Sequence, residues 1–86
     1  MSDEISITPA QCLGARAMLG WTRQQLAERA KVGAATLADF EAGKRQPYAR
    51  TLADIQGALE AAGIVFIPEG QPSPEGGAGV RLKAGA

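Results

Sequence analysis

The chain contains no histidine and only one cysteine. Zinc sites and acid–base catalytic pairs draw mainly on these two residue types, so we expect no metal site, no bound cofactor and no catalytic residues. The single thiol, Cys12, has no partner for an internal disulfide. We therefore predict that the protein is not an enzyme.

Long apolar runs are also missing from the sequence. No segment approaches the roughly 20 residues of a membrane-spanning helix, and the first residues show no signal-peptide pattern. We therefore expect a cytoplasmic protein with no membrane partner. The 86 residues allow one small core. Because a domain of this size buries a low fraction of its surface, association with a second copy would add stability.

Two segments in the first half of the chain predict short helices joined by a tight turn. Thr22 and the glutamine three positions later form a capping box, so a helix begins at about Arg23. Its apolar pattern breaks at residues 31–33, and a second helical run over residues 34–42 ends at Gly43. This order of elements is that of a helix-turn-helix.

The flanking segments add two further helices. A second capping box, which begins at Thr8, predicts a helix over residues 9–19. Apolar residues at helical spacing predict another helix over residues 49–62. Residues 8–63 are therefore expected to form a four-helix domain.

The last quarter of the chain changes in character. Residues 64–67 are β-branched and aromatic, and residues 80–83 alternate apolar and basic side chains, so both favour strands. The Pro/Gly-rich stretch at residues 68–79 predicts a mobile loop between them. We therefore expect a mainly α fold that ends in a β-hairpin at residues 64–83.

The spacing of a set of residues across these helices carries a family resemblance. They are Arg16, Gly20, Gln25, Leu26, Ala27, Val32, Thr36, Leu37, Glu41, Gly43, Pro47 and Leu52. With this spacing, residues 8–62 resemble the Cro- and repressor-like helix-turn-helix proteins of the XRE family. Lys31 stands where the family usually has a turn glycine and Gly33 where it often has a serine cap, but both residues are compatible with the turn. The resemblance implies a homodimeric transcriptional regulator that binds an inverted repeat in double-stranded DNA and controls its own operon.

The charges are placed unevenly along the chain, although the formal net charge is zero. Residues 16–50 carry seven basic and three acidic side chains, a balance of +4, and the rest of the chain carries −4. Attraction to phosphate is local, because salt screens it within about 10 Å. The asymmetry fits a basic surface that faces DNA, and it fits equally well with ordinary solvated charge on helix surfaces.

The resemblance implies that the second helix of the motif lies in the major groove. Alanine and aspartate make none of the bidentate base contacts of arginine or glutamine, so we expect sparse base reading. Phosphate contacts would then supply much of the affinity. The residues expected to face the groove are Ala34, Ala35, Ala38 and Asp39, with Thr36 near the DNA backbone. Contacts to phosphates or groove edges are expected from Arg23, Gln24, Lys44, Arg45 and Gln46.

Arg16 shares an inward helical stripe with Cys12 and Leu19, and a buried arginine needs a partner. In the resembling family an arginine at this position pairs with a glutamate near the end of the third helix, which is Glu41 in this chain. The resemblance therefore implies a structural ion pair between Arg16 and Glu41. Cys12 is expected to behave as a small core hydrophobe.

The predicted hairpin carries more apolar surface than one face of a small helical domain needs. A two-stranded hairpin is marginally stable and an uncovered edge invites pairing with another chain, so we expect a dimer interface here. The alternative is a lid folded back on its own helices, with dimerisation elsewhere or absent. The residues expected at the interface are Ile64, Val65, Phe66, Ile67, Val80 and Leu82.

A second function from another class fits the same sequence. A recognition helix with small apolar residues suits a protein-binding antitoxin or antiactivator that uses the helix-turn-helix fold without specific DNA binding. The two hypotheses differ in their response to salt. A DNA-binding regulator loses affinity for DNA steeply as salt rises, whereas a protein-binding module forms no specific DNA complex at any salt.

Overall fold

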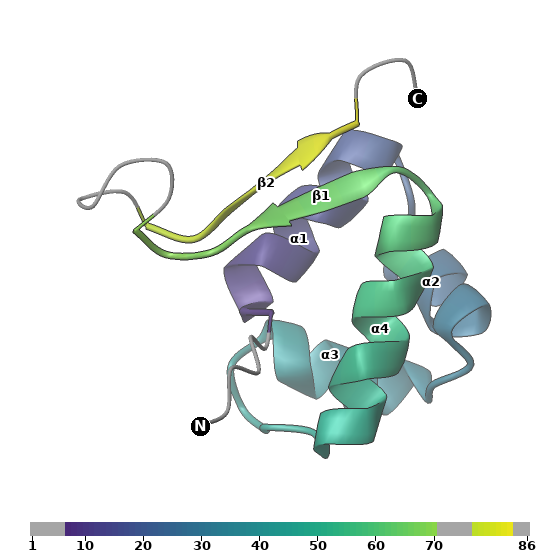
Figure 1. Ribbon diagram of the computed structural model, residues 1–86. Helices are drawn as coiled ribbons and strands as arrows, with labels where there is room; N and C mark the ends of the chain where they lie inside the picture. Colours follow the sequence, from purple (N-terminus) through teal and green to yellow (C-terminus); the bar gives the residue numbers. More distant parts are fainter. Residues whose placement is uncertain (1–6, 71–76, 84–86) are drawn as a thin grey trace.

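The structure, a computed structural model, describes residues 7–70 and 77–83 (Figure 1). Four helices are followed by a two-stranded antiparallel hairpin, which confirms the predicted fold class. The predicted loop at residues 68–79 falls partly on residues 71–76, which lie outside the described residues. The elements are α1 (Pro9–Leu19), α2 (Arg23–Ala30), α3 (Ala34–Glu41), α4 (Ala49–Ala61), β1 (Ile64–Ile67) and β2 (Gly79–Leu82).

Four boundaries differ by one residue from those predicted, and one of them is the end of β2, which lies at Leu82 rather than at Lys83. Helices α3 and α4 each end one residue early, because Ala42 and Ala62 occupy the cap positions before the glycines that stop the helices. Both glycines have positive φ, 76° for Gly43 and 107° for Gly63. Strand β2 begins at Gly79 rather than at Val80, since Gly79 pairs with the last residue of β1.

The first two helices begin with the capping boxes that their sequences predict. The hydroxyl of Thr8 accepts a 3.0 Å hydrogen bond from the amide of Gln11, whose side chain accepts a 2.9 Å bond from the amide of Thr8. Thr22 and Gln25 repeat the arrangement at 3.0 and 2.8 Å. Each box satisfies two amides that the start of a helix otherwise leaves without a partner.

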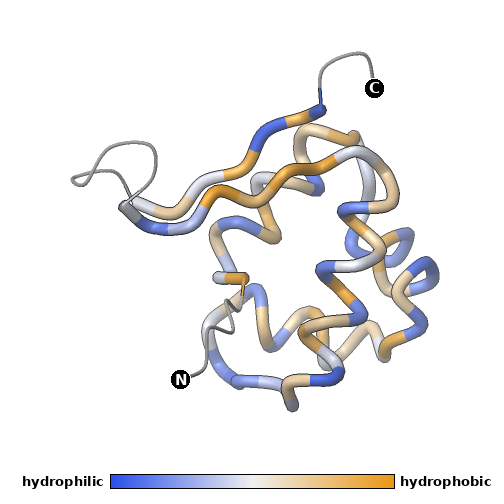
Figure 2. The backbone as a smooth tube through the Cα atoms, viewed as in Figure 1, coloured by the Kyte–Doolittle hydropathy of each residue, from blue (hydrophilic) through white to orange (hydrophobic). Residues whose placement is uncertain are grey.

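The core lies where the four helices meet. Its apolar side chains come from Ile7, from all four helices and from β1, which Figure 2 shows to be hydrophobic along its length. Among the described helices, none is long and apolar enough to cross a membrane. The largest fully buried side chains are Phe40, Leu26, Leu37, Ile55, Leu59 and Cys12.

The hairpin packs back on the helices with one face. Ile64 lies opposite Leu82 and Phe66 lies opposite Val80, and side chains that oppose one another share a face of the sheet. On this face Ile64 is buried, and Phe66 and Val80 pack against the core. An added Cβ at Gly14 would lie 3.4 Å from Val80 Cγ2, so β2 lies close to α1 at this point.

The six residues expected at a dimer interface therefore divide between two faces. Ile64 is only 3% exposed and already belongs to the core of its own chain, so it is not available to a partner. Val65 and Ile67 point away from the helices, because side chains alternate along a strand, and both stay partly exposed. The hairpin thus covers its own helices and keeps an open outer face. Helix α1 lies between the hairpin and α3 (Figure 1).

Gln11 connects the hairpin to the start of α1. Its side-chain nitrogen donates to the backbone oxygens of Ile67 at 3.3 Å and of Gly79 at 2.9 Å, while its oxygen serves the capping box. The side chain is buried, and these bonds give both its nitrogen and its oxygen a hydrogen-bond partner. One amide therefore joins the N-terminus of α1 to the end of the hairpin that is nearest to the loop.

The turns after α1 and α2 use the same left-handed backbone with different residues. Gly20 has φ 70° and Lys31 has φ 60°. The left-handed region costs a side-chain-bearing residue about 1–2 kcal/mol, and the greater freedom of unfolded glycine offsets about 0.4–1 kcal/mol of this. We therefore expect Lys31→Gly to raise the free energy of unfolding in urea by roughly 0.5–1 kcal/mol.

The matched control is Gly20→Lys, which should lower the free energy of unfolding by a similar amount. A Cβ added at Gly20 meets no atom within 4 Å, so only backbone strain acts there. Equal stability of Lys31→Gly and the unmodified protein would show that the turn after α2 carries no strain.

Candidate nucleic-acid interface

The turn between α2 and α3 sets the angle of the two helices. The amide of Lys31 donates to the oxygen of Glu28 at 3.3 Å, and the amide of Val32 donates to the oxygen of Ala27 at 3.1 Å. Val32 is partly buried and packs against the core. The chain therefore leaves α2 through a hydrogen-bonded cap with a hydrophobic contact, and α3 begins after Gly33.

Helix α3 buries one side and presents the other. Leu37 and Phe40 face the core. The expected groove residues lie on the accessible side: Ala34 and Ala35 are exposed, and Thr36, Ala38 and Asp39 are partly exposed. Their contact with DNA stays a prediction.

The loop after α3 presents three polar side chains in succession. Gly43 turns the chain with φ 76°, and Lys44, Arg45 and Gln46 follow as exposed residues. Pro47 is buried and fixes the end of the loop to the domain. Arg23 and Gln24, at the start of α2, are exposed as well. None of the ten residues expected to contact DNA is buried.

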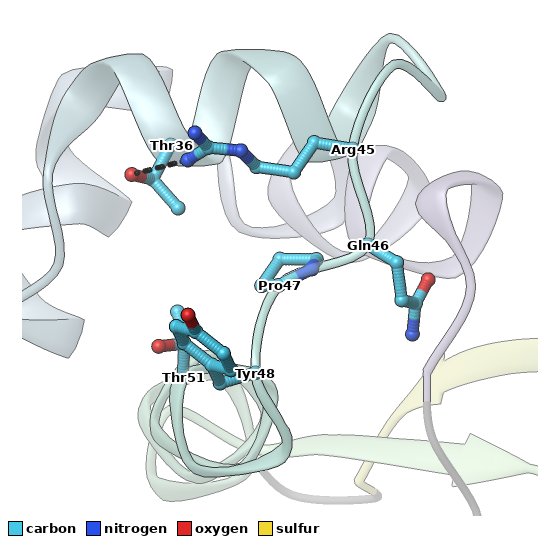
Figure 3. Close-up of a pocket in the computed structure, with 6 residues that line it drawn as sticks. All are labelled: Thr36, Arg45, Gln46, Pro47, Tyr48 and Thr51. Carbon is cyan, nitrogen blue, oxygen red and sulfur yellow. Dashed lines mark hydrogen bonds between the residues drawn. The ribbon is translucent and has the colours of Figure 1, made fainter.

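Arg45 and Thr36 are two of these ten residues that the structure brings together. The side chain of Arg45 runs back along α3, and its Nη1 donates to Thr36 Oγ1 at 3.4 Å (Figure 3). This bond places a guanidinium beside the first turn of the helix that is expected to enter the groove. The spacing in the sequence did not indicate this contact.

Glu41, at the end of α3, receives hydrogen bonds from two other helices. Arg16 approaches with two nitrogens, Nε to Oε2 and Nη2 to Oε1, both at 2.9 Å. The side chain of Glu41 is 2% exposed and that of Arg16 is 15% exposed. Arg16 also donates to the backbone oxygen of Trp21 at 3.1 Å. The structure therefore shows a buried, two-pronged ion pair between α1 and α3.

Two further donors complete the cluster, and sequence reasoning missed both. The thiol of Cys12 donates to Glu41 Oε2 at 3.2 Å, so this residue is a core side chain with a polar contact. Arg23, expected to contact phosphate, places its Nε 3.1 Å from Glu41 Oε1. The side chain of Arg23 is still 48% exposed. The only sequence signal was the position of Cys12 one helical turn before Arg16.

The cluster has defined protonation states. Burial alone would raise the pKa of the Glu41 carboxyl, but hydrogen bonds from Arg16, Cys12 and Arg23 outweigh burial and hold the pKa below its ordinary value of 4.5. Burial and the bond to Glu41 raise the pKa of the Cys12 thiol. At neutral pH the centre of the cluster is therefore a carboxylate, paired with guanidinium groups and a neutral thiol.

The sequence of the helical domain matches that of a known protein family. A family model described as Helix-turn-helix, of the Cro/C1 type in the XRE family, matches residues 15–61, more than half of the chain. The chain belongs to this helix-turn-helix family. A comparison with curated proteins found no match.

The matched residues cover the second half of α1 and all of α2, α3 and α4. They include the ten residues expected to contact DNA and both members of the Arg16–Glu41 pair. The XRE helix-turn-helix is a DNA-binding regulatory domain, not an enzyme family. The hairpin lies beyond the match, so membership of the family gives no information about it.

The buried cluster predicts strong energetic coupling between Arg16 and Glu41. Arg16→Met and Glu41→Leu should each lower the free energy of unfolding by roughly 3–5 kcal/mol, because each removes one member of the buried, two-pronged ion pair and leaves the other charge without its main partner. The double variant should lose much less than the sum of the two, measured by urea unfolding. Arg23→Met is the control on the same carboxylate: this side chain is half exposed, so its loss should cost about 1 kcal/mol or less. Additive effects at Arg16 and Glu41 would contradict the coupling.

Proposed function

We propose that this protein is a cytoplasmic transcriptional regulator that binds an inverted-repeat operator in double-stranded DNA as a homodimer. The observation that carries the proposal is the family's two-helix unit, whose second helix presents an accessible side next to exposed basic residues. Control of its own operon is part of the proposal and rests on the family resemblance alone.

The placement of charge supports attraction to DNA. The charges of Arg16 and Arg23 are paired with the carboxylate of Glu41. Lys44 and Arg45, in contrast, are exposed to solvent in the loop after α3. Counterions released from phosphates by such cations make the affinity fall with salt. Attraction of this kind is local, so it does not require a positive net charge for the whole chain.

The reading of bases is expected to be sparse. Ala34 and Ala35 can contact a thymine methyl group, and Asp39 can accept a hydrogen bond from cytosine N4. Neither residue type makes two hydrogen bonds to one base. Specificity would then depend on these few contacts and on the shape and deformability of the operator.

The exposed alanines of α3 also favour the second hypothesis, a protein-binding antitoxin or antiactivator. Sequencing the genomic fragments that the purified protein retains, at several salt concentrations, distinguishes the two. The regulator should enrich a palindromic sequence and release it as salt rises. Recovery of no sequence at any salt would reject the regulator in favour of the protein-binding module.

Single substitutions should separate phosphate contacts from base contacts. Lys44→Ala and Arg45→Ala should each weaken binding to operator and random DNA alike, and lower the slope of affinity against salt by about one unit. Asp39→Ala should instead change the preferred base at one position of each half-site. The control is Lys83→Ala, which also removes one positive charge but lies just after β2, outside the loop that is expected to face DNA. Unchanged affinities for both loop variants would show that the loop does not face DNA.

The outer face of the hairpin supports the dimer in the proposal. Val65 and Ile67 are both partly exposed there. A two-stranded sheet also has two edges at which another chain can pair. Such a dimer would present two recognition helices to half-sites about one DNA turn, roughly 34–36 Å, apart.

The dimer is best tested on this outer face. Deleting the hairpin would also remove Ile64 from the core and leave the side-chain nitrogen of Gln11 without acceptors, so loss of binding would be ambiguous. The double variant Val65→Lys, Ile67→Lys should instead be a folded monomer in analytical ultracentrifugation, because the added charges face outward. It should bind a full operator at least about ten-fold more weakly, while binding to an isolated half-site stays unchanged. Leu13→Lys, on the exposed side of α1, is the control. A variant that stays dimeric would exclude the outer face.

A further inference from the structure

A notch of about 370 Å³ opens between α3 and the start of α4. In Figure 3, Thr36 and Arg45 form one wall, Tyr48 and Thr51 form the opposite wall, and Pro47 lies between the walls. Gln46 completes the lining. Three of these residues, Pro47, Tyr48 and Thr51, are not among the residues predicted to contact DNA.

The lining of the notch has the chemistry of a site for a phosphodiester. It contains one guanidinium, one side-chain amide and the hydroxyl groups of Thr36, Tyr48 and Thr51, and it contains no carboxylate. Arginine, threonine, glutamine and tyrosine are all side chains that donate hydrogen bonds to DNA phosphates. The contact between Arg45 and Thr36 places the guanidinium at the wall of the notch.

Among residues 7–70 and 77–83, Tyr48 is the most exposed of the large hydrophobic side chains, at 86%. The other three aromatic residues of the chain, Trp21, Phe40 and Phe66, are buried or pack against the core. Packing within the domain therefore does not account for an aromatic residue at position 48.

Local helix stability does not account for it either. Tyr48 occupies the N-cap of α4 and makes no side-chain bond to the first turn. At the equivalent positions of α1 and α2, Thr8 and Thr22 form complete capping boxes. Serine, threonine, aspartate and asparagine are the residues that stabilise an N-cap. At this position the chain carries a side chain that neither packs nor caps.

We propose that the notch holds one sugar–phosphate unit of the bound DNA and that Tyr48 is a DNA-contact residue. The hydroxyl of Tyr48 donates to a phosphate oxygen, the tyrosine ring packs on the deoxyribose, and Arg45 neutralises the phosphate from the opposite wall. This inference rests on the proposed function, since the ligand of the notch is the backbone of the same operator. It adds to that function a contact made by the start of α4.

Three substitutions at this position separate contact from stability. Tyr48→Ala removes the side chain and, like tyrosine, caps nothing, so the melting temperature should not change while operator affinity falls about ten-fold. Tyr48→Phe removes only the hydroxyl and should give a smaller loss. Tyr48→Ser introduces a cap and should raise the melting temperature by about 4–8 °C, yet bind operator more weakly than the unmodified protein.

The salt dependence identifies the kind of contact. Tyrosine is neutral, so Tyr48→Ala should leave the slope of affinity against salt unchanged, whereas Arg45→Ala should lower it by about one unit. Met18→Ala, which removes an exposed side chain on α1, is the control and should bind normally.

The possible failures are distinct. If the unmodified protein binds operator and Tyr48→Ala binds equally well, the notch does not hold the DNA backbone, but the proposed regulator stands. If all three variants lose affinity only in proportion to a lowered melting temperature, Tyr48 is structural and the inference is wrong. If the unmodified protein retains no DNA at all, the proposed function fails and the inference fails with it.

Discussion

The geometry of the domain depends on the hydrogen bonds that the carboxylate of Glu41 accepts. Glu41 lies at the end of α3 and is bound by Arg16 and Cys12 of α1 and by Arg23, the first residue of α2. A buried ion pair adds little net stability, because desolvation offsets much of the attraction, but breaking it is costly. The cluster therefore acts mainly as a constraint: helices packed in another orientation would leave a charge buried without a partner. The angle at which α3 is presented follows from this constraint.

A second polar contact, at Gln11, holds the hairpin to the same helix α1. The hydrogen bonds from this side chain reach the backbone of both strands, while Ile64 inserts into the core. Helix α1 thus carries the two interactions that organise the molecule, one toward α3 and one toward the hairpin (Figure 1). Movement of the hairpin relative to α3 is limited by this shared helix, so any partner on the outer face of the hairpin would be held at a set distance from α3.

Local sequence rules predicted the elements well, because the signals lie within a few residues of one another. The capping boxes at Thr8 and Thr22 placed two helix starts, and glycines placed most of the ends. The family resemblance supplied Glu41 as the partner of Arg16. The Cys12–Glu41 and Gln11–Gly79 contacts join residues that lie 29 and 68 positions apart. Such contacts depend on how the elements pack, which no local pattern specifies. Cys12 was already explained as a core side chain and Gln11 as a member of a capping box, so neither residue called for a distant partner.

Stability is unevenly distributed over the domain. Helices α1 and α2 have side-chain caps, whereas α3 and α4 have none; the N-terminal ends of α3 and α4 contribute Thr36, Tyr48 and Thr51 to the notch. A missing side-chain cap lowers local stability by about 1 kcal/mol at Tyr48 and by only a few tenths of that at Gly33, a loss that a domain held by the Glu41 cluster and the core can tolerate. Binding sites commonly keep residues that are poor for local stability, because those positions serve a ligand instead. The absence of side-chain caps around the notch thus agrees with a surface completed by a bound partner, and the hydrogen-bond donors that line the notch suit a phosphate backbone in that position.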